Sequence, residues 1–195
     1  MGMELESIES LSRRAADLYR AGRHEEALEI CLSLADSSQA PSWILWLIGT
    51  MHLLGHGTKL NRKEGLSWYR RAADAGDPRA LTFFARHEQT AGRYLAAKAL
   101  LEEAASQGHL PAVIQLGYLY DRGLGVSRDP KRAREYFEQG ASEGYVFAKR
   151  FIAGQMLRGE DGLLGIPKGM VMLFKGFVEI LHLRIRDPES DKGRL

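Results

Sequence analysis

The hydrophobic positions of residues 112–148 recur at helical spacing on both sides of a glycine-rich corner. Before the corner, Val113, Leu116 and Tyr120 share one helix face. After it, the pair Asp129–Pro130 supplies an N-cap and a proline at the first helical position. The apolar positions that follow have the same spacing, and they are Ala133, Tyr136, Phe137 and Ala141. This stretch therefore predicts two helices joined as a hairpin.

The same pattern recurs along the chain, which indicates internal repeats. At an offset of 68 residues, Ile48–Gly49 matches Leu116–Gly117 without a gap. At the same offset, Gly55–Gly57 matches Gly123–Gly125. Weaker copies precede, separate and follow these two. Five units then tile the chain at about 9–43, 44–79, 80–111, 112–147 and 148–184, with residues 1–8 as an N-terminal extension.

Cap residues mark the helix ends in several copies. Gly76, Gly108 and Gly144 are expected to end a second helix in the left-handed conformation. Asn61, with Glu64 three residues later, has the spacing of a capping box. One such hairpin cannot bury its own apolar face, so the units must stack on their neighbours. The sequence predicts an all-α fold, an α-solenoid of about five helix-turn-helix hairpins.

The complete pattern of residues 112–148 resembles the Sel-one-like repeat (SLR) of the tetratricopeptide-like superfamily. The resemblance is strong there, good for 44–80, and only tetratricopeptide-like for 10–43 and 80–111. The fifth copy departs from the pattern, with GEDGLLGI in place of the short loop. The resemblance implies a right-handed superhelix and an adaptor or scaffold role in protein complexes, common in bacteria. It implies no catalytic activity and no cofactor.

Composition narrows the partners and the compartment. The 27 Lys and Arg residues nearly balance 25 Asp and Glu residues, which argues against a nucleic-acid-binding surface. Cys31 is the single cysteine, so no intrachain disulfide can form and a reducing, cytoplasmic compartment is expected. The N-terminus lacks the apolar stretch of a signal peptide. Charged residues interrupt the apolar run 163–183, so no transmembrane segment is expected.

Three features could indicate an enzyme or a metal site. The segment Gly123–Gly125 could cradle a phosphate, but it lacks the Lys-Ser/Thr pair and preceding strand of such loops, so a helix corner is favoured. His52 and His56 have the spacing of a metal-binding pair, but His52 occupies the packing position of Tyr120 and no further ligand is near in the sequence. Cys31 fits a partly buried structural thiol. We therefore expect no catalytic residue and no metal.

In tetratricopeptide-like arrays the first helix of each pair lines a concave groove. The repeat register places there Ser12, Tyr19, Trp43, Trp46, Thr50, Thr82, Arg86, Gln89, Ile114, Tyr118, Arg122, Arg150 and Arg158. Aromatic and arginine side chains are enriched at binding hot spots, and arginine pairs well with carboxylates. A protein or peptide partner, acidic or ending in a C-terminal carboxylate, is therefore expected. The alternative is that the tryptophans pack against the neighbouring unit and that the arginines pair with nearby acids in solvent.

The stretch 166–184 predicts a helix with a wide apolar face. Its apolar residues are Met170, Val171, Leu173, Phe174, Phe177, Val178, Ile180 and Leu181, of which Phe174, Phe177 and Leu181 form a second candidate interface. Such a face could fold back on the array, form a homodimer, meet a partner helix, or lie on a membrane surface. A homo-oligomerising structural protein, or one associated with a membrane surface, is thus the alternative function. Residues 187–195 are expected to form a disordered tail.

Overall fold

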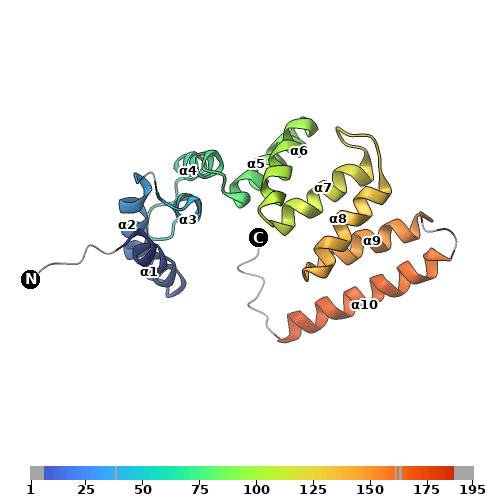
Figure 1. Cartoon of the computed structure of the whole chain (residues 1–195). Coiled ribbons are helices and arrows are strands. Elements are labelled where there is room, and N and C mark those ends of the chain that lie inside the picture. The colour runs from blue at the N-terminus through green and yellow to red at the C-terminus, as the bar shows by residue number, and fades with distance from the viewer. Residues whose placement is uncertain (1–6, 38, 161, 163, 187–195) are drawn as a thin grey trace, which may run out of the picture. The chain divides into compact units, whose positions relative to one another are not determined.

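The structure, a computed structural model, describes residues 7–37, 39–160, 162 and 164–186, which form ten α-helices and no strand (Figure 1). The helices are α1 (Ile8–Arg20), α2 (His24–Ala35), α3 (Ser42–Leu54), α4 (Arg62–Asp74), α5 (Pro78–Thr90), α6 (Tyr94–Ser106), α7 (Leu110–Arg122), α8 (Pro130–Ser142), α9 (Val146–Leu157) and α10 (Gly165–Arg186). The predicted all-α repeat fold is confirmed. The predicted tail at 187–195 lies outside the described residues.

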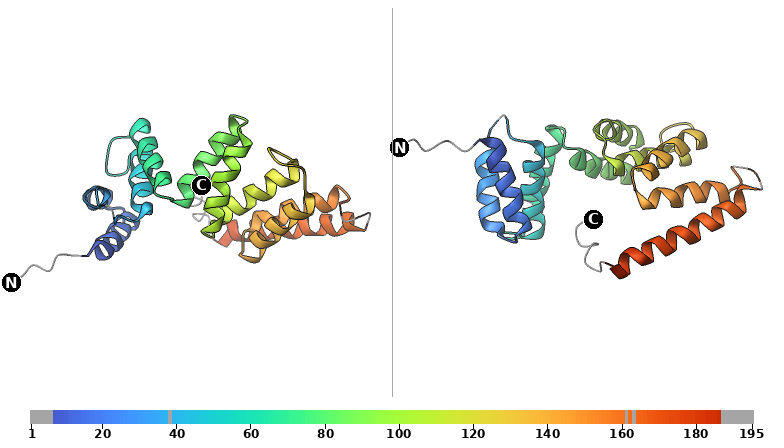
Figure 2. Two further views of the ribbon diagram at one scale, coloured as in Figure 1. Left: turned by 45° about the horizontal axis from the view of Figure 1, so that its top comes forward. Right: turned by 60° about the horizontal axis from the view of Figure 1, so that its bottom comes forward.

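Consecutive helices pack as antiparallel hairpins within two compact units. Unit 1 is Met1–Arg86 and unit 2 is His87–Leu195, so α5 crosses the boundary between them. In unit 1, α1 packs on α2 and α3 on α4; in unit 2, α7 packs on α8 and α9 on α10. The α9–α10 pair is seen from two sides in Figure 2. Contacts of α2 with α3, of α6 with α7 and of α8 with α9 join successive hairpins.

Polar side chains begin several helices as the sequence predicts. The Asp129 carboxylate accepts the backbone N–H three residues on at 3.0 Å, and the Asn61 amide oxygen accepts that of Glu64 at 3.2 Å. The predicted capping box at α4 forms in one direction only. The Glu64 carboxylate accepts the indole N–H of Trp68 at 3.1 Å, while the Asn61 N–H donates to the His52 carbonyl at 2.8 Å.

Left-handed glycines end three of the second helices, α4, α6 and α8. Gly76 has φ 77°, its N–H donates to the Ala73 carbonyl at 2.9 Å, and the next N–H donates to the Ala72 carbonyl at 2.8 Å. These two bonds make a Schellman motif, which satisfies carbonyls that the helix leaves unpaired. Gly108 and Gly144, with φ of 77° and 83°, take the same conformation. The predicted C-caps are confirmed.

Two helical glycines allow the paired helices to approach closely. A Cβ on Gly117 would lie 2.6 Å from Phe137 Cε1, and one on Gly49 would lie 2.4 Å from Tyr69 Cδ1. Both distances are far below van der Waals contact. The aromatic residue of the second helix therefore sits directly over the glycine of the first.

Candidate functional site

The two glycine corners are packed against protein backbone. Gly57 and Gly125 have φ of 67° and 68°. A Cβ on Gly57 would lie 2.5 Å from the carbonyl carbon of His24, and one on Gly125 would lie 2.6 Å from Cβ of Tyr94. Each corner thus rests on the first residue of the preceding hairpin's second helix, α2 or α6. This contact gives the glycines a structural role and leaves no phosphate cradle at that position.

Two of the three histidines of unit 1 stack on one another. The rings of His24 and His56 are nearly parallel with centroids 4.4 Å apart, and His56 Nδ1 lies 3.1 Å from the Tyr19 hydroxyl. Burial and the neighbouring His24 lower the pKa of His56 below its ordinary value. His52 Nδ1 is buried without a hydrogen-bond partner among the described residues. Within those residues no group of three or more His, Cys, Asp and Glu is placed to hold a metal ion.

The single cysteine is enclosed in the core of unit 1. Cys31 is fully buried among Ala27, Leu28 and Leu34 of the same helix and other apolar side chains of α1 and α3. Burial raises the pKa of its thiol to about 12. Because the thiolate is the reactive form, this environment makes Cys31 a packing residue.

In unit 1, two of the expected groove residues take part in aromatic packing. Trp46 stacks on Tyr69 with ring centroids 3.7 Å apart, and Phe83 meets both rings edge-on. The Thr50 hydroxyl lies 3.0 Å from the Tyr69 hydroxyl and donates to the Trp46 carbonyl at 3.0 Å. Trp46 and Thr50 therefore join α3 to α4.

Trp43 lies beside an open pocket between α1 and the start of α3. The pocket has a volume of about 440 Å³, and Ile8, Ser12 and Pro41 also line it. Ser12, which the sequence places in the groove, is buried with its hydroxyl unpaired among the described residues. Trp43 also packs against the unit 1 core, so it contacts the protein interior as well as the pocket.

The remaining expected groove residues of α5 and early α7 differ in exposure. Thr82 and Ile114 are buried, which contradicts their expected place on the groove surface. Both face helix neighbours, and the Thr82 hydroxyl donates to the carbonyl of the preceding turn at 2.7 Å. Gln89 donates from Nε2 to Gln115 Oε1 at 3.2 Å, while Arg86 is exposed.

The clearest aromatic and arginine surface lies in unit 2. Here α7 contributes Tyr118 and Arg122, and α9 contributes Phe147, Arg150 and Phe151; we call these five residues the α7–α9 patch. The Tyr118 ring meets Phe151 edge-on at 6.4 Å, with the Arg122 guanidinium 5.8 Å from its centroid. The Arg150 guanidinium lies 5.9 Å from the Phe147 ring. Tyr118 is 37% exposed and Phe147 48%, so large aromatic surface is open to a partner.

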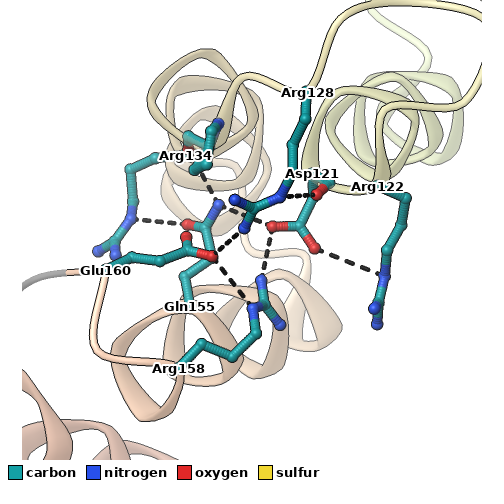
Figure 3. Close-up of polar contacts among 8 residues, drawn as sticks. Asp121, Arg122, Arg128, Arg134, Gln155, Arg158 and Glu160 are labelled. Carbon is teal, nitrogen blue, oxygen red and sulfur yellow. Dashed lines mark hydrogen bonds and ion pairs between the residues drawn. The ribbon is translucent and has the colours of Figure 1, made fainter.

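A polar network with a buried centre joins α9 to α7, the two helices that carry this patch (Figure 3). Asp121 is 5% exposed and Gln155 is fully buried. Asp121 Oδ1 accepts Gln155 Nε2 at 3.1 Å and Arg158 Nη2 at 2.6 Å, and Arg122 Nε lies 3.7 Å from Oδ2. Gln155 Oε1 in turn accepts Arg134 Nε at 2.9 Å. The network fixes the spacing of Tyr118 and Phe151 because its members flank them on the same two helices.

The network also includes the loop after α9. Glu160 Oε1 accepts Arg158 Nε at 3.1 Å and pairs with Arg128 Nη2, while Arg128 Nε donates to the Asp121 carbonyl at 3.0 Å. Arg158, which the sequence places among the groove arginines, is therefore engaged with two carboxylates of its own chain. Here the alternative interpretation from the sequence, arginines paired with nearby acids, is the one that the contacts favour.

The outer face of α10 exposes large apolar side chains. Phe174 is 70% exposed and Phe177 65%, and Met170 and Val171 are also exposed. The side chain of Leu181, the third residue of the second candidate interface, lies outside the described residues. No helix in the described part of the chain is long and apolar enough to cross a membrane.

Comparison with known proteins identifies the repeat. The model of the Sel1 repeat matches residues 45–77, 94–109 and 110–145. No curated protein sequence matches the chain significantly. A Sel1 repeat protein from Oxalobacter formigenes has 24% identity and a TM-score of 0.70, over 89% of this chain and 73% of its own. The protective antigen c5321 of uropathogenic Escherichia coli, which displays an SLR fold, has 22% identity and a TM-score of 0.71, over 89% of this chain and 38% of its own. The chain therefore contains Sel1 repeats, and it shares its fold with solved Sel1-like repeat structures.

Proposed function

We propose that the protein is a non-catalytic interaction scaffold that binds a protein or peptide through the α7–α9 patch. Sel1 repeat proteins are generally protein-interaction scaffolds and are typically non-catalytic. The observation that carries the proposal is the pairing of exposed aromatic rings with arginines on two adjacent first helices, Tyr118 with Arg122 and Phe147 with Arg150.

Recognition at this patch would combine apolar contact with carboxylate pairing. The aromatic rings offer rigid surface that loses little side-chain entropy on binding, and the guanidinium groups beside them can form paired hydrogen bonds with a carboxylate. The network of Asp121 and Gln155 keeps α7 and α9 in place before the partner arrives, which lowers the ordering cost. An acidic segment or a C-terminal carboxylate fits this chemistry best.

The other expected groove residues take different parts in the proposal. Trp43, beside the unit 1 pocket, and Arg86, exposed on α5, are candidate contact residues of unit 1 by itself. Trp46, Thr50 and Gln89 act indirectly, by holding their helices in position.

Affinity capture from the native host tests the proposal. Wild-type protein is compared with a Tyr118→Ala/Arg150→Ala variant and with a Lys131→Ala control, which changes an exposed residue of α8. We expect at least one protein to be recovered by wild type and control but several-fold less by the patch variant, with circular dichroism unchanged. Equal recovery of every captured protein by all three would contradict the proposal.

The exposed face of α10 favours a second candidate function, in which the protein acts through this helix by self-association or at a membrane surface. Phe174 and Phe177 are the observation that supports it. Truncation after Gly165 and measurement of the mass in solution separate the two functions. A drop from dimer to monomer on truncation would support self-association, and an unchanged monomeric mass would oppose it.

A further inference from the structure

Helices α9 and α10 enclose an apolar groove on the surface of unit 2. Its volume is about 660 Å³. Met156 of α9 and Pro167, Val171 and Met172 of α10 supply most of its apolar wall. Methionine side chains are flexible and polarisable, so a surface rich in them adapts well to an inserted apolar side chain.

The groove continues onto the outer face of α10. Val171 lines the groove and is also 55% exposed, and Met170, Phe174 and Phe177 extend the apolar surface from there. The last three recur at i, i+4 and i+7, which forms a stripe along one side of a helix. The groove and the stripe together form an apolar surface that extends along α10.

Lysines border this surface at regular spacing. Lys168 and Lys175 both line the groove and stand seven residues apart on α10. Seven residues correspond to about two helical turns and roughly 10 Å along the axis. Lys149 of α9 lines the groove from the other side. Apolar groups seated in the groove would thus have ammonium groups along their edges.

The net charge of the C-terminal segment also favours an acidic partner. Residues 146–186 contain seven Lys and Arg against three Asp and Glu, a net charge of +4, whereas the complete chain carries +2. A second copy laid antiparallel or parallel on α10 would place lysines near lysines, which is unfavourable at short range. A lipid bilayer is flat and cannot fill a groove with two helical walls. A helix can, because an amphipathic helix lays its apolar stripe into such a groove.

We propose that the α9–α10 groove binds an amphipathic helix of a partner protein that carries acidic residues beside its apolar stripe. The partner's apolar residues, spaced i, i+3 or i+4 and i+7, contact Val171, Met156 and Met172. Its carboxylates, two turns apart, pair with Lys168 and Lys175. This site is separate from the α7–α9 patch, and it is an alternative to the self-association and membrane binding considered for α10 above.

A synthetic peptide tests the groove with the complete chain. The probe is a fluorescein-labelled 18-residue helix with leucines at i, i+3, i+4 and i+7 and two glutamates seven residues apart at the edge of that stripe. The comparison peptide has lysines in place of the two glutamates. We expect the glutamate peptide to bind roughly tenfold more tightly, because its two carboxylates form exposed ion pairs with Lys168 and Lys175, and such pairs are individually weak. The preference should shrink at 1 M salt.

Charge reversal on the protein is the decisive part of this binding experiment. Lys168→Glu/Lys175→Glu should reverse the preference so that the lysine peptide binds more tightly, while the control Lys63→Glu/Lys131→Glu should leave it unchanged. Failure of both peptides to bind, or equal binding of both, overturns the proposal. So does lysine-dependent sedimentation with anionic phosphatidylserine vesicles in the absence of peptide binding. A dimer that Phe174→Asp converts to monomer would show that a second copy covers the surface, which also overturns it. None of these variants touches the α7–α9 patch, so the two proposals fail or succeed separately.

Discussion

Gly117→Ala tests the close approach on which each hairpin depends. The added methyl group would lie 2.6 Å from Phe137 Cε1 and 3.1 Å from Tyr136 Cβ, where carbon atoms normally stand about 3.5–4.0 Å apart. Phe137 is fully buried and stacks on Phe151 at 4.7 Å, so its ring has little room to move away. Overpacking of this kind costs about 1–3 kcal/mol. Alanine recovers about 1 kcal/mol through its better helix propensity. The net result is a loss of about 1 kcal/mol.

Gly176→Ala is the matched control, because a Cβ at this helical position of the same unit meets nothing within 4 Å. Only the propensity gain of up to about 1 kcal/mol remains there, so this variant should be more stable than wild type. Urea unfolding followed by circular dichroism gives both free energies of unfolding. Their difference isolates the packing cost, expected at about 1–3 kcal/mol. If the two variants change stability equally, α7 and α8 do not meet at Gly117 and the argument fails.

Three further predictions concern Asp121, the histidine stack and Cys31. Asp121→Ala should lower the free energy of unfolding in urea by roughly 2–3 kcal/mol, because it removes one of the two acceptors of the buried Gln155 amide and breaks a partly exposed ion pair with Arg158; a loss under 0.5 kcal/mol would contradict the network. The pKa of His56 is lower in the folded chain than its ordinary value of 6.5. At a pH between these two pKa values, unfolding therefore takes up a proton. The free energy of unfolding should be highest above about pH 6.5 and should fall as the pH drops through that window. Thermal melts from pH 7.5 to 5 should show this fall, and His56→Gln should reduce it; an unchanged slope would argue against the stacked pair. Cys31, with its pKa raised to about 12, should react with Ellman's reagent at pH 8 far more slowly in the native state than in denaturant, and equal rates would show that the thiol is accessible.

The hairpins could be predicted because each carries its own local signals. A cap such as Asp129, a left-handed glycine such as Gly144 and an apolar face at helical spacing act within one or two turns, so they are visible along the chain. The two glycine corners are also local structures, and each contains the same backbone hydrogen bond. The N–H of His56 donates to the Met51 carbonyl at 2.9 Å, and Leu124, 68 residues later, makes the same bond at 3.0 Å.

The side-chain partners of the candidate site could not be predicted, since they join residues far apart in the sequence. Arg158 pairs with Asp121, 37 residues away, and the register alone gave the arginine a place in the groove. Gln155, fully buried at the centre of that network, was missed; its one signal was an uncharged polar residue inside the apolar helix 146–157. The sequence does not predict the stacking of His56 on His24, because this contact depends on how the corner at Gly57 packs against α2.

Photo-crosslinking in the native host tests the central claim, a partner bound at the α7–α9 patch, most directly. The photoreactive amino acid p-benzoylphenylalanine replaces Tyr118 in one sample and Lys131 of α8 in the other. The account predicts a light-dependent adduct with a discrete protein at position 118, at much higher yield than at position 131. No adduct at position 118, or the same adduct at equal yield from both positions, would contradict it.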